Sequence, residues 1–306
     1  MRDEEPGLGA FHGVRWRSHH KIIVSEGGIP GGIISVMDPD RLRHPLHVPS
    51  LREEVAGLPW RRIEVIDETG STNADLLARA AAGEDIDGLV LIAEHQTAGR
   101  GRSGRSWSAA PRAQIALSAG VSAAGVPIDT WGWLPLAVGV AVNDTVAAQT
   151  GVEAGLKWPN DVLAGGGKLA GILAEVAAPR PLIVVGVGLN VTLRADEVDD
   201  PMAISLADLG VAAPDRQQLA SRLLFELGRR IAQWRAADQQ LAADYRARSL
   251  TIGAGVRAIL PGDREVVGVA RSVDDQGRLC IESEGRIVEV SAGDVVHIRP
   301  VHRPRP

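Results

Sequence analysis

The pattern of hydrophobic positions predicts a series of strands and helices between residues 62 and 248. Residues 62–67 alternate polar and apolar side chains, as a half-buried strand does. Short apolar or β-branched runs predict further strands over residues 88–93, 113–121, 169–176 and 182–191, the last two as neighbours. Helices are expected from about Thr72, where Thr72 and Asp75 resemble a capping box, over residues 131–150, and as a long amphipathic region over residues 215–248.

The C-terminal part of the chain has a different pattern. Four short apolar runs, at residues 256–260, 266–270, 279–281 and 287–290, are separated by turns rich in Gly and Asp. Short strands at such close spacing are typical of a small all-β domain, and we expect a barrel.

The first 50 residues show no sustained periodicity. They contain many Gly and Pro residues and five of the eight histidines, at a spacing that matches no standard metal site. We expect residues 1–50 to be an irregular extension, disordered over residues 1–36. The domains that follow are then a main domain (51–248), a small β domain (249–300) and a tail (301–306).

Composition narrows the class of protein. The chain has 306 residues, of which 45% are hydrophobic and 23% charged, and a net charge of −5. This is an ordinary globular balance, and it argues against binding to nucleic acid by bulk charge. The most apolar run, residues 133–142, is too short to span a membrane. The single cysteine, Cys280, cannot form an internal disulfide, which fits a reducing, cytoplasmic setting; its default role is a buried strand residue.

Positive charge and glycine are concentrated in the segment from Gln96 to Trp107. Three arginines and three glycines alternate within residues 99–105. Glycine lets backbone N–H groups approach an anion, arginine offers paired donors to phosphate or carboxylate, and a Trp ring can stack on a purine. The segment therefore predicts a loop that closes over a nucleotide anion, the alternative being a solvated surface turn.

Two better-known phosphate motifs do not fit the chain. Gly99, Gly101 and Gly104 match the spacing of a dinucleotide-binding turn, but a predicted strand follows them where that turn requires a helix. Lys168 follows glycines but precedes Leu169, whereas a Walker loop requires Ser or Thr there.

Two further segments carry candidate chemistry. Residues 156–173 contain two apolar runs around a glycine turn, which predicts a hairpin with Lys168 at the root of a strand. In residues 186–191, Gly186 and Gly188 leave room beside a strand, and Asn190 at its end is either a turn residue or a ligand.

Taken together, these segments resemble the biotin–protein ligases, over nearly everything after residue 50. The motifs that occur in the family's order are Ser71-Thr72-Asn73, residues 99–107, Lys157-Trp158-Pro159-Asn160-Asp161 and residues 168–173. The resemblance is closest to the short actinobacterial-type members. It implies an α+β fold with a mixed β-sheet backed by helices, like class II aminoacyl-tRNA synthetases and lipoate ligases, and a C-terminal SH3-like β-barrel. The segment before Arg62 is too short and too rich in Gly and Pro for the winged helix-turn-helix of the repressor members.

The resemblance also implies a reaction in two steps. Biotin and ATP form biotinyl-5′-AMP, and a lysine of a biotin carboxyl carrier protein of an acyl-CoA carboxylase then takes the biotinyl group. Mg²⁺ is expected with ATP, although no carboxylate cluster marks its ligands. No nucleic acid or membrane partner is expected, and a homodimer is compatible with the resemblance.

The family pattern assigns roles to individual residues. Lys168, Asp161 and Arg102 carry the catalytic roles: Lys168 and Arg102 contact the carboxylate and phosphate, and Asp161 orients or deprotonates the incoming lysine. The residues implied to bind biotin are Ser71, Thr72, Asn73, Gln96, Arg100, Gly101, Arg102 and Lys168. Those implied to bind ATP are Arg102, Arg105, Trp107, Lys157, Asn160 and Asn190.

Several of these assignments have plain alternatives. Lys168 is otherwise a surface lysine, Trp107 a core residue, and Asp161 a turn cap or a lysine partner. Lys157 contacts phosphate or only supports packing. For the whole protein, the rivals are a lipoate or octanoate ligase, a biotin-sensing regulator and a non-catalytic binding protein.

Overall fold

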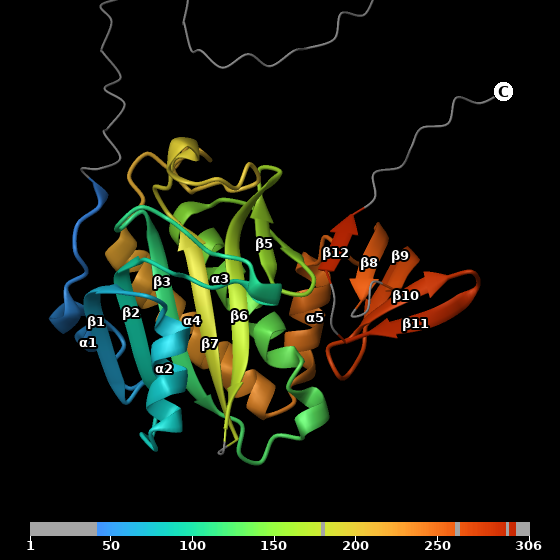
Figure 1. Ribbon diagram of the computed structural model, residues 1–306, viewed down its shortest axis with the longest axis horizontal. Helices are drawn as coiled ribbons and strands as arrows, with labels where there is room; N and C mark the ends of the chain where they lie inside the picture. The colour runs from blue at the N-terminus through green and yellow to red at the C-terminus, as the bar shows by residue number, and fades with distance from the viewer. Residues whose placement is uncertain (1–41, 179–180, 261–263, 292–293, 298–306) are drawn as a thin grey trace, which may run out of the picture. The chain divides into compact units, whose positions relative to one another are not determined.

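A seven-stranded mixed sheet forms the larger part of the protein. The computed structural model describes residues 42–178, 181–260, 264–291 and 294–297 (Figure 1), so the expectations for residues 1–36 and 301–306 lie outside the described residues. The strand order is β1-β2-β3-β7-β6-β5-β4, with β1 and β2 parallel and all other neighbours antiparallel. The strands are β1 (Arg62–Thr69), β2 (Leu89–Gln96), β3 (Gln114–Ser122), β4 (Gly155–Lys157), β5 (Asp161–Ala164), β6 (Gly167–Ala177) and β7 (Leu182–Asn190). This confirms the predicted mixed sheet, including the neighbouring strands β6 and β7.

Helices cover both faces of this sheet. The helices are α1 (Val48–Glu54), α2 (Thr72–Ala81), α3 (Trp133–Thr150), α4 (Arg216–Arg235) and α5 (Gln239–Arg248), with short 3₁₀ turns at Arg102–Gly104, Ile128–Thr130 and Ala195–Glu197. α2 lies on one face, and α3 with α4 lies on the other (Figure 1).

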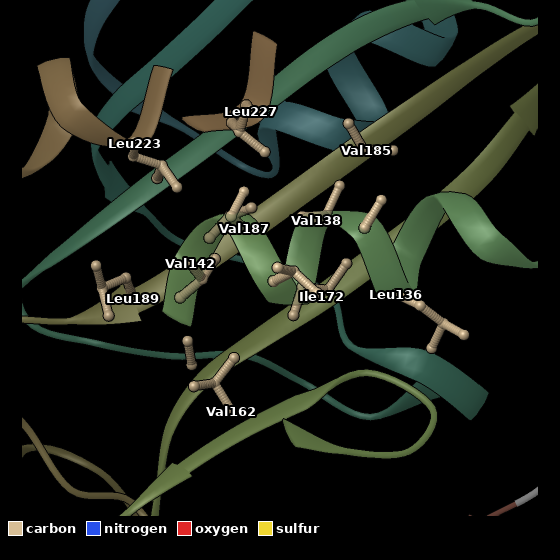
Figure 2. Packing of buried hydrophobic residues seen from close by; sticks show 14 of the residues in the cluster. Leu136, Val138, Val142, Val162, Ile172, Val185, Val187, Leu189, Leu223 and Leu227 are labelled. Carbon is tan, nitrogen blue, oxygen red and sulfur yellow. The ribbon is translucent and has the colours of Figure 1, made fainter. Parts of the chain in front are cut away.

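Side chains of β7 point alternately to the two faces of the sheet and pack against the helices on each face. Val185, Val187 and Leu189 point to the α3 side, where they pack against Val138 and other side chains of α3 and α4 (Figure 2). The intervening positions point to the α2 side, where Val184 joins a smaller core with Leu76 of α2. Two of these intervening positions are Gly186 and Gly188, so this face of the strand lacks side chains there.

The C-terminal residues form the predicted small β domain. Its five-stranded antiparallel sheet has the order β11-β10-β9-β8-β12. The strands are β8 (Gly255–Leu260), β9 (Arg264–Val273), β10 (Leu279–Ser283), β11 (Arg286–Val290) and β12 (Asp294–His297). Two indoles of the main domain donate hydrogen bonds to its backbone, Trp133 to Asp274 O (2.9 Å) and Trp158 to Gly277 O (3.0 Å).

The structure differs from the sequence expectations at three places. The N-cap of α2 is Ser71, which accepts from Ala74 N. The Thr72 hydroxyl instead contacts the hydroxyl of Ser118 on β3. The long helical region is broken at Ala237, whose φ is +50°, and Asp238 caps the next helix. The extension expected up to residue 50 is packed from residue 42 onward, where Leu46 is buried and α1 already begins at Val48.

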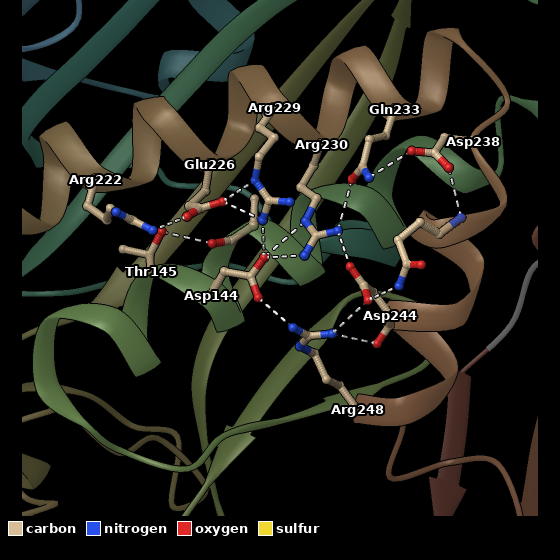
Figure 3. Close-up of polar contacts among 12 residues, drawn as sticks. Asp144, Thr145, Arg222, Glu226, Arg229, Arg230, Gln233, Asp238, Asp244 and Arg248 are labelled. Carbon is tan, nitrogen blue, oxygen red and sulfur yellow. Dashed lines mark hydrogen bonds and ion pairs between the residues drawn. The ribbon is translucent and has the colours of Figure 1, made fainter.

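A network of ion pairs joins the helices behind the sheet (Figure 3). Asp144 of α3 accepts from Arg229 and Arg230 of α4 and from Arg248 of α5, at 2.5–2.8 Å. Because Arg230 is buried, these contacts compensate a charge that burial would otherwise penalise. The burial of the Arg230 guanidinium lowers its pKa, but hydrogen bonds to Asp144 and Asp244 outweigh this and raise the pKa overall.

Candidate functional site

A cavity lies on the α2 face of the sheet, over the gap left by small side chains. The space between its lining residues, including the part that is open to solvent, is about 770 Å³. In the strand register, Gly188 of β7 lies between Ala116 of β3 and Gly171 of β6, and Gly186 lies between Ser118 and Leu173. Apart from Leu173, the floor therefore consists of small residues, in keeping with the room expected beside Gly186 and Gly188.

The arginine-rich segment forms a closed hairpin at the rim of this cavity. We call residues 99–107 the flap. Its arms are joined by a β-bridge between Arg100 and Ser106 and by the hydrogen bond from Trp107 N to Gly99 O (2.8 Å). A side chain at Gly99 would place its Cβ only 2.2 Å from Trp107 O, so the turn requires glycine there.

Trp107 ends the flap and lies against the glycine floor. A Cβ on Gly188 would come within 2.3 Å of the Trp107 Nε1 atom, and one on Gly171 within 2.9 Å of its ring. The indole N–H donates to Gln114 Oε1 (2.6 Å), and the Lys168 ammonium lies 5.3 Å from the ring centroid. The ring is thus held in a fixed plane that lines the cavity, and it is not a buried core residue.

One end of the cavity carries neutral hydrogen-bonding groups. Thr72 donates its backbone N–H to Gln96 Oε1 (2.9 Å), and its hydroxyl lies 2.6 Å from that of Ser118. Ser118 in turn donates to Asn73 Oδ1 (2.6 Å). These groups orient one another through their hydrogen bonds. The donors and acceptors that they do not use among themselves therefore have fixed directions.

The other end of the cavity is cationic. The Lys168 ammonium lies 2.8 Å from Asp161 Oδ1, and Lys157 lies 3.8 Å from the other oxygen of Asp161. Arg102 of the flap donates to Asn160 Oδ1 (3.4 Å), and Asn160 donates its amide to Ile172 O (2.9 Å). Lys168 and Arg102 therefore converge at this end of the cavity. Lys168 belongs to β6, and Asn160, the partner of Arg102, is fixed by the backbone of the same strand.

The structure brings most of the predicted site residues together. Those that line the cavity are Ser71, Thr72, Asn73, Gln96, Arg100, Gly101, Arg102, Arg105, Trp107, Asn160 and Lys168. Asp161 and Lys157 lie behind Lys168 rather than in the lining. Asn190 is fully buried and donates to Lys168 O (3.3 Å) and Ile204 O (3.1 Å), so it supports the end of β6 and does not face the cavity.

Sequence reasoning missed four polar residues of the site. Ser118 and Asp200 line the cavity, and Gln114 holds the Trp107 indole. Glu175 of β6 accepts from Asn73 (2.9 Å) and lies 3.1 Å from the Arg100 guanidinium. The available signal was period-two alternation, since Gln114 and Ser118 occupy the same face of β3, and Gly171 and Glu175 the same face of β6.

Two observations bear on other classes of site. Within the described ranges, no three His, Cys, Asp or Glu side chains gather closely enough to hold a metal ion. No helix of the described part of the chain is long and apolar enough to cross a membrane.

Comparison with known proteins places this geometry in a family. Residues 65–191 match the model of the biotin/lipoate A/B protein ligase family, and residues 251–298 match the C-terminal domain of biotin protein ligases. A biotin–[acetyl-CoA-carboxylase] ligase of Mycobacterium tuberculosis is 66% identical over 267 residues, which are 86% of this chain and 99% of that protein. The bifunctional ligase/repressor BirA of Escherichia coli is 32% identical over 263 residues, 83% of this chain and 79% of that protein.

Solved structures share the fold. A biotin protein ligase from Aquifex aeolicus, in complex with biotin and ATP, superposes with a TM-score of 0.68 at 24% identity, covering 78% of this chain and all of that one. A Leishmania major biotin protein ligase with biotinyl-5-AMP gives a TM-score of 0.54 at 23% identity, covering 76% of this chain and 99% of that one. With both domains matched and a relative aligned over nearly its whole length, the chain belongs to the biotin protein ligase family.

Proposed function

We propose that this protein activates biotin with ATP as biotinyl-5′-AMP and transfers the biotinyl group to a lysine of a carboxyl carrier protein. The observation that carries the proposal is the polarity of one cavity. It has neutral hydrogen-bonding groups at Thr72 and Asn73, a floor that includes Gly186 and Gly188 and is partly covered by Asn73 and Trp107, and cations at Lys168 and Arg102. This order matches biotin, which has a neutral ureido ring, an apolar chain and a terminal carboxylate.

The first step must bring two anions together. At about 4 Å, two unit charges repel by about 4 kcal/mol at the effective dielectric of a partly solvated site. Lys168 and Arg102 offset this repulsion, because both point to the end of the cavity where the carboxylate oxygen would attack the α-phosphorus. A P–O bond to the carboxylate forms, the bond to pyrophosphate breaks, and the same cations stabilise the charge on the phosphoryl oxygens.

The second step transfers the acyl group. The ε-amine of the acceptor attacks the carbonyl carbon of the mixed anhydride, and AMP leaves with the bond electrons. The attacking amine has to lose a proton, and Asp161 is the nearest carboxylate to the Lys168 ammonium. We propose that Asp161 first balances the charge of Lys168 and then receives this proton as AMP departs.

The nucleotide would lie against Trp107. Its ring plane is fixed by Gln114 and by the glycine floor, and it borders the cavity, so stacking on adenine requires no rearrangement of the ring. We assign Arg105 and Asn160 to the phosphate and ribose side, since both also line the cavity. Asn190 is a positioning residue for Lys168 in this proposal, through its bond to the Lys168 carbonyl.

The described residues supply no ready-made carboxylate cage for magnesium. Mg²⁺ that accompanies ATP would therefore be held through phosphate oxygens and water, with Asp200 as the one carboxylate in the cavity lining. We derive no step through the ion.

The acceptor would be the biotin carrier of an acyl-CoA carboxylase, because the relative at 66% identity is named for that substrate. We propose a cytoplasmic site of action, in keeping with the single cysteine, and no nucleic acid partner, in keeping with the net charge of −5.

The decisive experiment measures transfer of radiolabelled biotin to a purified carrier domain, with and without ATP. The proposal requires transfer that depends on ATP and on the acceptor lysine, with biotinyl-AMP trapped when the carrier is omitted. Parallel reactions with lipoate and octanoate test the rival substrates. Preferential transfer of either would overturn the assignment to biotin.

A further inference from the structure

Glu175 of β6 connects the neutral end of the cavity to the root of the flap. Its two carboxylate oxygens have different partners: Oε2 accepts from Asn73 Nδ2 at 2.9 Å, and Oε1 lies 3.1 Å from Arg100 Nη2. The Glu175 side chain is 23% exposed and that of Arg100 is 50% exposed. The pair is thus partly shielded from water, at the edge of the site.

The contact with Asn73 fixes the direction of its amide. Asn73 Oδ1 accepts from Ser118, and its Nδ2 donates to both Leu173 O (3.2 Å) and Glu175. A flipped amide would place its NH₂ against the Ser118 hydroxyl and its oxygen against two acceptors, so it is disfavoured. The amide also lies directly on Gly186, where any side chain would collide with it.

The contact with Arg100 fixes the flap. Arg100 forms the bridge with Ser106 that joins the two arms of the flap, so an anchor at Arg100 acts on the hairpin as a whole. The flap continues from the end of β2, where Ala98 N donates to Gly70 O (2.9 Å). The pairing with Glu175 ties it in addition to β6, across the cavity.

We infer that Glu175 is a positioning residue that couples closure of the flap to the orientation of the biotin-binding amide of Asn73. In this arrangement the Arg100 side chain is an anchor of the flap rather than a clamp on the carboxylate of biotin. The inference rests on the proposed function, since it concerns retention of biotin and its adenylate.

Three substitutions separate the two contacts. Glu175→Gln keeps an oxygen that can accept from Asn73 but removes the charge that holds Arg100. Glu175→Ala removes both contacts, the one with Asn73 and the one with Arg100. Arg100→Gln removes the anchor from the other side. A matched control is Glu64→Gln on β1, because Glu64 is similarly exposed and pairs with Arg79 at 2.8 Å, away from the cavity.

The measurements are the release rate of biotinyl-AMP, the KM for biotin and the thermal midpoint. Glu175→Gln and Arg100→Gln should each speed release of biotinyl-AMP by about threefold, as the loss of a partly exposed ion pair implies, with a smaller change in the KM for biotin. Glu175→Ala should in addition raise that KM by about tenfold, because the Asn73 amide loses its acceptor. The double variant Glu175→Gln, Arg100→Gln should release the adenylate no faster than either single variant.

The inference would be overturned if Glu175→Gln released biotinyl-AMP at the rate of the wild type. It would also be overturned if the two substitutions multiplied each other's effect on this rate in the double variant. A change in the thermal midpoint alone, also seen with Glu64→Gln, would assign Glu175 a purely structural role and count against it equally. Failure of the proposed function is distinguishable, because the wild-type protein would then form no biotinyl-AMP at all.

Discussion

The Lys168 ammonium and the Asp161 carboxylate form an ion pair of 2.8 Å at the cationic end of the cavity. Lys157 lies opposite Asp161 in the β4–β5 register and approaches its second oxygen at 3.8 Å. Lys168 is therefore held in place by a charge of opposite sign. This pairing makes Asp161 the partner of a lysine, and the proton transfer proposed for Asp161 belongs to the second step.

Lys168→Ala is expected to reduce formation of biotinyl-AMP by about 10²–10³-fold, the usual effect of removing one preorganised donor from a developing anion. The rate of pyrophosphate release measures this step without the acceptor. Lys157→Ala is the control, since its ammonium is outside the cavity lining, and its effect should be much smaller. Equal losses in the two variants would contradict the role given to Lys168.

Arg102→Ala should mainly cause loss of the intermediate. Arg102 reaches from the flap to Asn160 on the opposite wall, so its removal should loosen the closed flap more than it slows the chemistry. Filtration of the enzyme after reaction with biotin and ATP measures how much adenylate is retained. Retention equal to the wild type would show that Arg102 does not help to close the flap.

Gly188→Ala should raise the KM for ATP. The added Cβ would lie 2.3 Å from Trp107 Nε1 and would displace the indole from its plane. Gly139→Ala in α3 is the control, because its Cβ would meet only a side-chain atom at 3.4 Å. An unchanged KM for ATP would remove the nucleotide role of Trp107.

Asp144→Asn should lower the free energy of unfolding by about 1.5–3 kcal/mol, because it removes one of the two carboxylates that pair with the buried guanidinium of Arg230 and leaves only Asp244. Denaturant titration measures this value. The exposed pair of Arg194 with Asp196 provides the control, and Asp196→Asn should cost less than about 1 kcal/mol. Similar losses in the two variants would show that the network of Figure 3 behaves as an ordinary set of surface ion pairs.

His297 should make stability depend on pH. Burial, with a smaller contribution from Lys157, lowers the pKa of His297 below its usual 6.5. The unfolded chain then binds more protons than the folded one between the two pKa values, so stability is full above pH 6.5 and falls as the pH drops toward the folded pKa. Urea unfolding at several pH values above 5 should show this slope, and His297→Gln, which can still bond to Thr251, should remove it.

Much of this protein follows from its sequence because the relevant information is local. The apolar, β-branched run over residues 182–191 predicted β7, and Gly186 and Gly188 predicted room beside that strand. The motifs around Arg102 and Lys168 predicted the cationic end of the cavity. Strand period, turn chemistry and motif order all act over a few neighbouring residues, so one sequence is enough to reveal them.

Only the tertiary structure decided which side chains meet. Asn190 and Trp107 belong to equally plausible motifs, yet the first is buried behind Lys168 and the second faces the cavity. Alternation places Glu175 on the cavity face of β6 but does not identify its partners, since Asn73 and Arg100 come from segments about a hundred and 75 residues away. Such contacts depend on the order and register of strands in the sheet, and a strand's own pattern specifies which face a residue takes but not what lies opposite it.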